Sequence, residues 1–499
     1  MVRQGRFAFV GSFEDARAAH PGAKVEDFGG NLVMPGMTDA HMHLTAFARQ
    51  GLYIDMQGAC SLDEAGRVLR ERAARTEPGV WMRAVNYNEM SWPDRQSPTA
   101  AWLDALGLEH PIIMSRYCGH SHVANTRALR EGGLWDSADP CVIREDGVPT
   151  GRLIEGAAGP LIELAAAQAE TPQRLTEAME QAVHAMSAQG ITAAHPCDAP
   201  GYALGEELFT WQDLQERGRL PIRIVCYHDR LPEFSFRSGI GDGQIRYGGL
   251  KLFCDGNLGG RGAALREPYA DMPECTGVLN HTDEELYEAM RGAHVRGIQV
   301  ALHMIGDRAV EQAVRTAERL VAELGQPRLP YRFIHVICCP DDLCRRMKRL
   351  GVVADIQPCE VYADRVMAPL RLTPGQLRDT YPFRALQDAG LLLTGSTDAP
   401  MEAEDLWFGI WAAVCRCDDD GAPLPYDPAQ ALTLDEALRL FTVNPWIAVG
   451  MGDRLGRIRE GYYADFTAVD GDPFRRPTME LRSTTHLATW LEGAKVWER

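Results

Sequence analysis

The sequence predicts an α/β protein whose main domain is a (β/α)8 TIM barrel. Apolar strand-like segments alternate with helical segments through the middle of the chain, which is the pattern of βα units around a parallel sheet. Both chain ends consist of short strand-like segments, and residues 50–160 interrupt the alternation. We therefore expect a barrel over 36–447, a small β-sandwich domain formed by 1–35 and 448–499, and an insertion at about 50–160 after the first barrel strand.

The small β-domain is predicted from strand signals at both ends of the chain. Residues 1–35 contain "GRFAFVG" and "KVEDFGGNLVMPG", which we interpret as short strands separated by turns. The last 50 or so residues contain "GRIREGYYADFTAVDGDPF" and "HLATWLEGAKVWER", with strand-like runs between Gly and Asp turns. Two β-rich ends around a long middle indicate that both termini build one domain.

The barrel is predicted from eight apolar segments with helices between them. The candidate strands are 32–43, 190–196, 222–229, 248–256, 297–305, 332–338, 351–358 and 390–399. Capping boxes mark the starts of two helices, pairing Thr282 with Glu285 and Thr433 with Glu436. The insertion contains a capped helical segment at 61–74 and is long enough to cover the barrel mouth.

Composition narrows the class of protein. The chain has 499 residues and a net charge of −18, which disfavours binding to nucleic acid or to an anionic membrane. No apolar run is long enough for a transmembrane helix, and the first residues lack the apolar core of a signal peptide. The 13 cysteines form no C-x-x-C pair, so we interpret them as reduced. We expect a cytoplasmic protein acting on a small molecule.

Six polar side chains lie on or just beyond the apolar strands: His41, His43, Lys251, His303, His335 and Asp398. In TIM barrels the active site lies at the carboxyl ends of the strands. Taken singly, each residue has a structural explanation, namely a hydrogen-bonded core histidine, a lysine that reaches solvent, or an aspartate that caps a turn. Taken together, buried charges at one end of a barrel are costly unless they are paired or bound to a metal. The sequence therefore predicts a metal site.

The motifs resemble those of the amidohydrolase superfamily. The similar stretches are "MPGMTDAHMHL", "LKLFCDGNLGGRGAALREPYAD", "ALHMIGDRAVEQAV", "GSTDAPM" and the long segment that begins "LTLDEALRLF". They look like the amidohydrolase-3 subgroup, which includes N-substituted formamide deformylase, and the resemblance covers nearly the whole chain.

The resemblance implies a set of metal ligands. His41 and His43 would bind one cation, which Asp398 would also contact, and His303 and His335 would bind a second. Lys251 would be N-carboxylated and would bridge the two ions. Zinc suits imidazole and carboxylate ligands, although iron or manganese would also fit, and a site with one ion remains an alternative.

The resemblance also implies the chemistry. A metal-bound hydroxide would attack an amide-like carbonyl, and Asp398 would move the proton from water to the leaving nitrogen. The predicted function is hydrolysis of a C–N bond in a small amide, such as an N-acyl or N-formyl compound. The alternatives are a metal-dependent decarboxylase or lyase on the same barrel and a non-catalytic metal-binding regulator. By analogy we expect a homodimer.

Four further residues are candidates for substrate binding. His120 in "GHSH" and Glu155 in "GRLIEG" come from the insertion, and His195 ends an earlier barrel strand. Asp307 follows His303 by four positions. For each of them a structural role is the alternative: a hydrogen-bonded histidine, a carboxylate at a helix start, or an ion pair that supports the site.

Overall fold

The computed structural model describes residues 1–499 except 94, 117–120, 199–205 and 234–235. The chain divides into two compact units, one formed by Met1–Thr45 with Val183–Arg499 and the other by Ala46–Ala182. Among the described residues, no helix combines the length and the apolar character needed to cross a bilayer. The described cysteines are free thiols.

The first unit contains an eight-stranded parallel barrel. Its strands lie in the order β17-β16-β15-β14-β13-β12-β11-β4, and each neighbouring pair is parallel. In chain order they are β4 (Met37–Met42), β11 (Ile191–Pro196), β12 (Arg223–His228), β13 (Ile245–Phe253), β14 (Gln299–Met304), β15 (Arg332–His335), β16 (Val353–Ile356) and β17 (Leu392–Gly395). The backbone N–H of Asp398 donates to His41 O at 3.0 Å, which brings the two sheet ends together. The predicted TIM barrel is confirmed.

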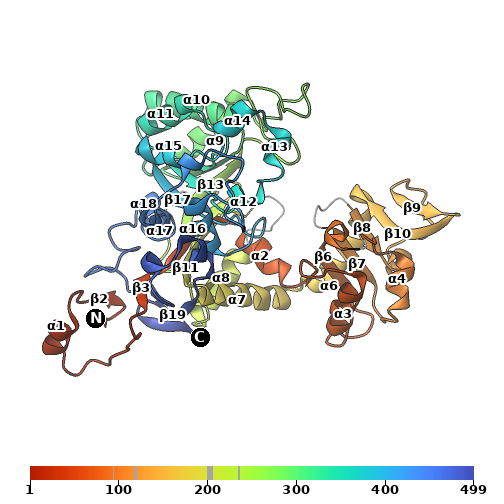
Figure 1. Ribbon diagram of the computed structural model, residues 1–499, viewed down its shortest axis with the longest axis horizontal. Helices are drawn as coiled ribbons and strands as arrows, with labels where there is room; N and C mark the ends of the chain where they lie inside the picture. Colours follow the sequence, from red (N-terminus) through yellow and green to blue (C-terminus); the bar gives the residue numbers. More distant parts are fainter. Residues whose placement is uncertain (94, 117–120, 199–205, 234–235) are drawn as a thin grey trace. The chain divides into compact units, whose positions relative to one another are not determined.

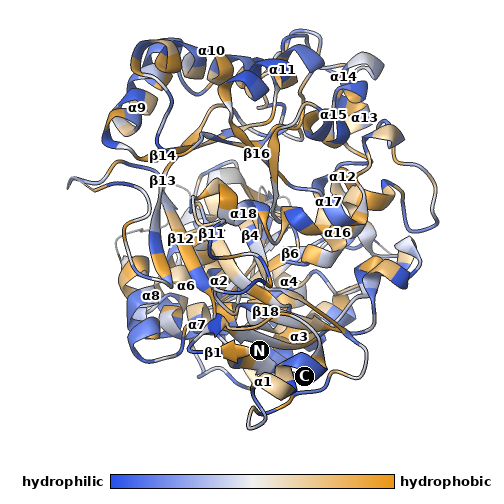
Figure 2. Cartoon of the chain, turned by 90° about the vertical axis from the view of Figure 1, so that its left-hand side faces the viewer, coloured by the Kyte–Doolittle hydropathy of each residue, from blue (hydrophilic) through white to orange (hydrophobic). Residues whose placement is uncertain are grey.

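Helices connect most of the barrel strands, and further helices follow the last strand, β17. They include α7 (Pro172–Ala188), α8 (Glu206–Glu216), α9 (Asp283–Arg296), α10 (Asp307–Leu324), α11 (Asp341–Leu350), α15 (Phe383–Asp388), α16 (Leu406–Cys415), α17 (Leu434–Leu440) and α18 (Asn444–Ala448). Both predicted capping boxes are present, at Thr282 and Thr433. Figures 1 and 2 show α9, α10 and α11 around the strands, with hydrophobic residues along β14 and β16. The connection from β12 to β13 contains no helix in its described parts, 229–233 and 236–244.

Both chain ends contribute to one antiparallel sheet of the first unit. Its strands are β3 (Leu32–Pro35), β18 (Phe466–Val469), β19 (His486–Leu491) and β20 (Ala494–Glu498), in the order β20-β19-β18-β3. A separate hairpin joins β1 (Val2–Arg3) to β2 (Arg6–Phe7). Residues 1–35 are not all strand and turn as expected, because α1 (Phe13–Ala19) forms after Ser12, whose side chain accepts from Asp15 N.

The second unit is built around a six-stranded mixed sheet of order β5-β6-β7-β8-β10-β9. The strands are β5 (Ile54–Asp55), β6 (Met82–Tyr87), β7 (Ile112–Arg116), β8 (Ser121–Ala124), β9 (Val142–Glu145) and β10 (Val148–Ile154). The helical segment predicted at 61–74 is α3 (Leu62–Ala73), which Ser61 caps. An apolar cluster that includes Leu69 and Met114 packs α3 against this sheet. The unit therefore has a hydrophobic core of its own.

Candidate metal centre

The barrel brings the six predicted side chains to one place. His41 lies on β4 and His43 just after it, Lys251 lies on β13, and His303 lies on β14. His335 ends β15, and Asp398 follows β17 by three residues. Because these strands are parallel, their carboxyl ends meet at one end of the barrel. Side chains separated by more than 350 positions in the sequence therefore converge.

Asp398 lies between the two histidines of the H-x-H motif. Its Oδ1 is 3.1 Å from His41 Nε2 and 3.4 Å from His43 Nε2. Lys251 Nζ is 3.3 Å from the same His41 nitrogen. Asp39 stabilises this arrangement, because its carboxylate accepts hydrogen bonds from the Thr397 backbone N–H and hydroxyl. The end of β17 is thereby fixed to β4 beside Asp398.

His303 and His335 form the other half of the cluster. Their ring centroids lie 4.5 Å apart, and the His335 ring lies 5.6 Å from that of His41. His335 has φ of 72° and Asp398 has φ of 60°, left-handed conformations that are uncommon for residues other than glycine. Strained backbone of this kind clusters at functional sites, where the surrounding structure holds it in place.

Burial sets the protonation of the cluster. It lowers the pKa of His41 and His303 well below 6.5 and lowers the pKa of His43 to about 4. It also lowers the pKa of Lys251. Burial acts to raise the pKa of Asp398, but its contacts with His41 outweigh that effect and hold the pKa below the usual range. At His41, His43 and His303 the cluster therefore offers neutral imidazoles beside the ionised carboxylate of Asp398.

The donor set fits a divalent cation. Ligand atoms of His41, His43 and Asp398 lie within 4.8 Å of one another, and so do those of His335, Glu360 and Asp398. Among the described residues, Asp398 Oδ1 and Glu360 Oε2 are buried without a hydrogen-bond partner. Zinc ligands lie about 2 Å from the ion and hence roughly 3–4 Å from one another, which is the spacing found around Asp398 Oδ1. Imidazole nitrogen and carboxylate oxygen are also the ligand types that zinc prefers.

The structure adds two carboxylates that were not singled out from the sequence. Glu360 begins α12 (Glu360–Ala363) just after β16, and its Oε1 lies 3.5 Å from His335 Nδ1. Asp255 follows β13, and its Oδ1 lies 3.5 Å from His303 Nε2. Both follow strand ends, so the positional rule that found the other six applies to them. Asp255 also accepts from the backbone N–H groups of Ala264, Ile305 and Gly306, which fixes it against His303.

Of the four predicted substrate-binding residues, His195 and Asp307 make no described contact with the six clustered side chains. His195 is fully buried, with Nδ1 3.4 Å from Arg332 Nη1 and its ring 5.7 Å from that of Trp446. Asp307 begins α10 and accepts from the Arg266 backbone N–H at 2.8 Å. Glu155 begins the short helix η2 (Glu155–Ala158) in the second unit, and nothing is described of its side chain. His120 lies outside the described residues.

Comparison with known proteins decides the family. The amidohydrolase family model matches residues 24–497. The chain belongs to the amidohydrolase family. The resemblance identified from the motifs is therefore confirmed, and the match runs through the barrel, the insertion and the terminal sheet of this amidohydrolase.

Relatives match this amidohydrolase along its full length. It is 28% identical over 509 residues to YtcJ of Bacillus subtilis (strain 168), named as an amidohydrolase, covering 100% of this chain and 95% of the relative. It is 28% identical over 522 residues to the N-substituted formamide deformylase of Arthrobacter pascens, covering 100% and 94%. The crystal structure of a metal-dependent hydrolase from Pyrococcus horikoshii OT3 superposes with a TM-score of 0.78 at 26% identity, covering 96% of this chain and 94% of that one.

Proposed function

We propose that this amidohydrolase is a metal-dependent hydrolase of a non-peptide C–N bond in a small amide, such as an N-acyl or N-formyl compound. The observation that carries the proposal is the pair of overlapping ligand sets, His41, His43 with Asp398 and His335, Glu360 with Asp398, at the carboxyl end of the barrel. The Arthrobacter relative, which is named as a formamide deformylase, supports an amide substrate.

The proposed ligands divide between one or two divalent cations, with zinc as the first candidate. His41, His43 and Asp398 would hold one ion, His303 and His335 would hold another, and Lys251 would join them as a carbamate. A bound cation of this kind lowers the pKa of water and polarises a carbonyl oxygen. Addition of CO2 to neutral Lys251 forms an N–C bond and releases one proton, and it replaces an ammonium that would repel a cation beside His41.

Asp398 is the proposed proton carrier. An ionised carboxylate can accept a proton from water and then deliver it to the leaving nitrogen. The reaction adds one water across the C–N bond, so a carboxylic acid and an amine leave in equal amounts. Asp39 and Thr397 act as positioning residues, because their hydrogen bonds hold the backbone on which Asp398 stands.

The proposal is tested by metal analysis of the purified protein together with turnover on N-formyl and N-acyl amines. We expect one or two divalent ions per chain and equal yields of acid and amine. His41→Ala should lose metal, and Asp398→Asn should lower kcat by about 100-fold or more. His281→Ala, a histidine outside the cluster, should retain both metal and activity. Release of CO2 would instead indicate a decarboxylase, and metal without turnover of any amide would indicate a regulator; either result overturns the proposal.

A further inference from the structure

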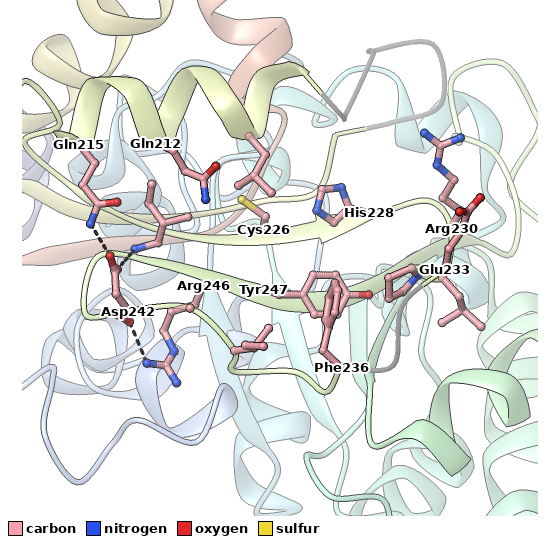
Figure 3. Close-up of a pocket in the computed structure, with 16 residues that line it drawn as sticks. Gln212, Gln215, Cys226, His228, Arg230, Glu233, Phe236, Asp242, Arg246 and Tyr247 are labelled. Carbon is pink, nitrogen blue, oxygen red and sulfur yellow. Dashed lines mark hydrogen bonds between the residues drawn. The ribbon is translucent and has the colours of Figure 1, made fainter. Parts of the chain in front are cut away.

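A cavity lies on the outer face of the barrel, beside α8 and the strands β12 and β13. It has a volume of about 700 Å³, which is within the range of small-molecule pockets. The cavity is where a connecting helix would pack in a regular barrel, and residues 229–233 and 236–244 form none. Among the described residues, no helix between β12 and β13 packs on the outward side chains of these two strands. We call this cavity the outer pocket (Figure 3).

Three aromatic rings form one wall of the outer pocket. The His228 and Tyr247 rings stack with centroids 5.7 Å apart and an interplanar angle of 17°. The Phe236 ring meets Tyr247 edge-on, with centroids 5.2 Å apart. Aromatic pairs with these geometries contribute beyond the area they bury, and a further ring can add to them in the same way. This wall favours a planar aromatic ligand.

Tyr247 carries an unused polar group in this apolar setting. The residue is only 9% exposed, and its hydroxyl has no hydrogen-bond partner among the described residues. Figure 3 shows the hydroxyl pointing toward the end of the pocket that Arg230 and Glu233 line. A buried hydroxyl without a partner is destabilising, because it has given up its hydrogen bonds to water. A ligand with its own hydroxyl or carbonyl would supply that partner.

The other polar groups of the outer pocket favour an uncharged ligand. At the opposite end the Asp242 carboxylate is already satisfied, because it accepts from Gln215 and from the Gln244 and Ile245 backbone N–H groups. Arg230 and Glu233 are exposed at the near end and carry opposite charges. Solvent screens both charges, and their opposite signs offset each other. The pocket therefore has little attraction for a ligand of either charge.

We propose that the outer pocket binds a small neutral aromatic molecule through ring contacts with His228, Phe236 and Tyr247 and a hydrogen bond to the Tyr247 hydroxyl. None of its lining residues belongs to the candidate metal centre. The proposal therefore stands independently of the proposed hydrolase activity.

The test measures binding of p-cresol and of toluene to the full-length protein by ligand-observed NMR titration. Wild type should bind p-cresol saturably. Tyr247→Phe should weaken p-cresol binding about fivefold, the effect of one lost hydrogen bond, and should leave toluene binding unchanged. Tyr462→Phe is the matched control, because Tyr462 is 8% exposed, its hydroxyl already donates to Gly452 O, and it lies outside the pocket.

Three results would overturn the proposal. One is the absence of saturable p-cresol binding up to its solubility limit. Another is equal affinity of wild type and Tyr247→Phe for p-cresol, with thermal unfolding showing that the variant is folded. The third is crystallographic density for p-cresol at the metal centre and none beside Tyr247.

Discussion

At the scale of single residues, Glu360 shows how a side chain near the cluster can act through another. It lies beside His335 Nδ1, and a carboxylate at that nitrogen fixes the ring orientation and raises the basicity of the other nitrogen. Its close approach also raises the pKa of His335 against the opposing effect of burial. Glu360 therefore positions His335, a proposed metal ligand, and its own carboxyl group lies within reach of the same cation site.

We expect Glu360→Gln to weaken metal binding about 10- to 100-fold, the usual effect of removing such a partner. The measurement is metal affinity by competition with a chelator, which needs no substrate. Glu402→Gln is the control, because burial and the nearby Glu360 raise the pKa of Glu402 to about 8. Glu402 is thus largely uncharged at pH 7. The glutamine side chain that replaces it is also uncharged and has nearly the same shape. If wild type and Glu360→Gln bound the metal with equal affinity, Glu360 would have no role in metal binding.

At the scale of elements, the hydrogen bonds between Asp39 on β4 and Thr397 after β17 join the two ends of the barrel sheet. The Thr397 hydroxyl also accepts from the Ala399 backbone N–H at 3.0 Å. Thr397→Val removes these side-chain bonds and leaves buried polar groups unpaired. We expect a loss of about 1–3 kcal/mol in the free energy of unfolding, measured by chemical denaturation.

The matched control for that variant is on the neighbouring strand. The hydroxyl of Thr38, on β4, is buried and has no hydrogen-bond partner in the described part of the chain. Thr38→Val is the same substitution, but its effect on the free energy of unfolding should be neutral or slightly stabilising. It removes a buried hydroxyl that makes no hydrogen bond. Equal destabilisation by both variants would show that packing, rather than the bond to Asp39, is what Thr397 contributes.

The elements also show why the sequence predicts the barrel but not the whole site. Strands buried in a parallel sheet are continuous apolar runs, so their ends, and the polar residues there, can be read directly. Glu360 was not grouped with the strand-end residues, because it lies four positions beyond the end of β16 and starts a short helix. The open face beside Tyr247 could not be predicted, because the absence of a helix over most of 229–244 becomes meaningful only once its neighbours are placed.

At the scale of the whole molecule, His486 ties the terminal sheet to the barrel helices within the first unit. Trp407 on α16 donates its Nε1–H to His486 Nε2 at 3.1 Å, and His486 Nδ1 lies 2.8 Å from the Thr467 hydroxyl on β18. Because that hydroxyl donates to Ala488 O, the histidine must donate from Nδ1 and accept at Nε2. Only the neutral ring satisfies both bonds.

This arrangement makes the stability of the fold sensitive to mild acid. Burial lowers the pKa of His486 from 6.5 to about 4, so between these pH values the unfolded chain binds a proton that the folded chain does not. Stability is therefore unaffected by this group above pH 6.5 and falls as the pH drops toward 4, by up to about 3 kcal/mol. His486→Gln can still accept from Trp407 and cannot titrate. We expect the difference in unfolding free energy between wild type and His486→Gln to shrink or reverse from pH 7 to pH 5. A difference that stays constant with pH would show that His486 does not cause the pH dependence of stability.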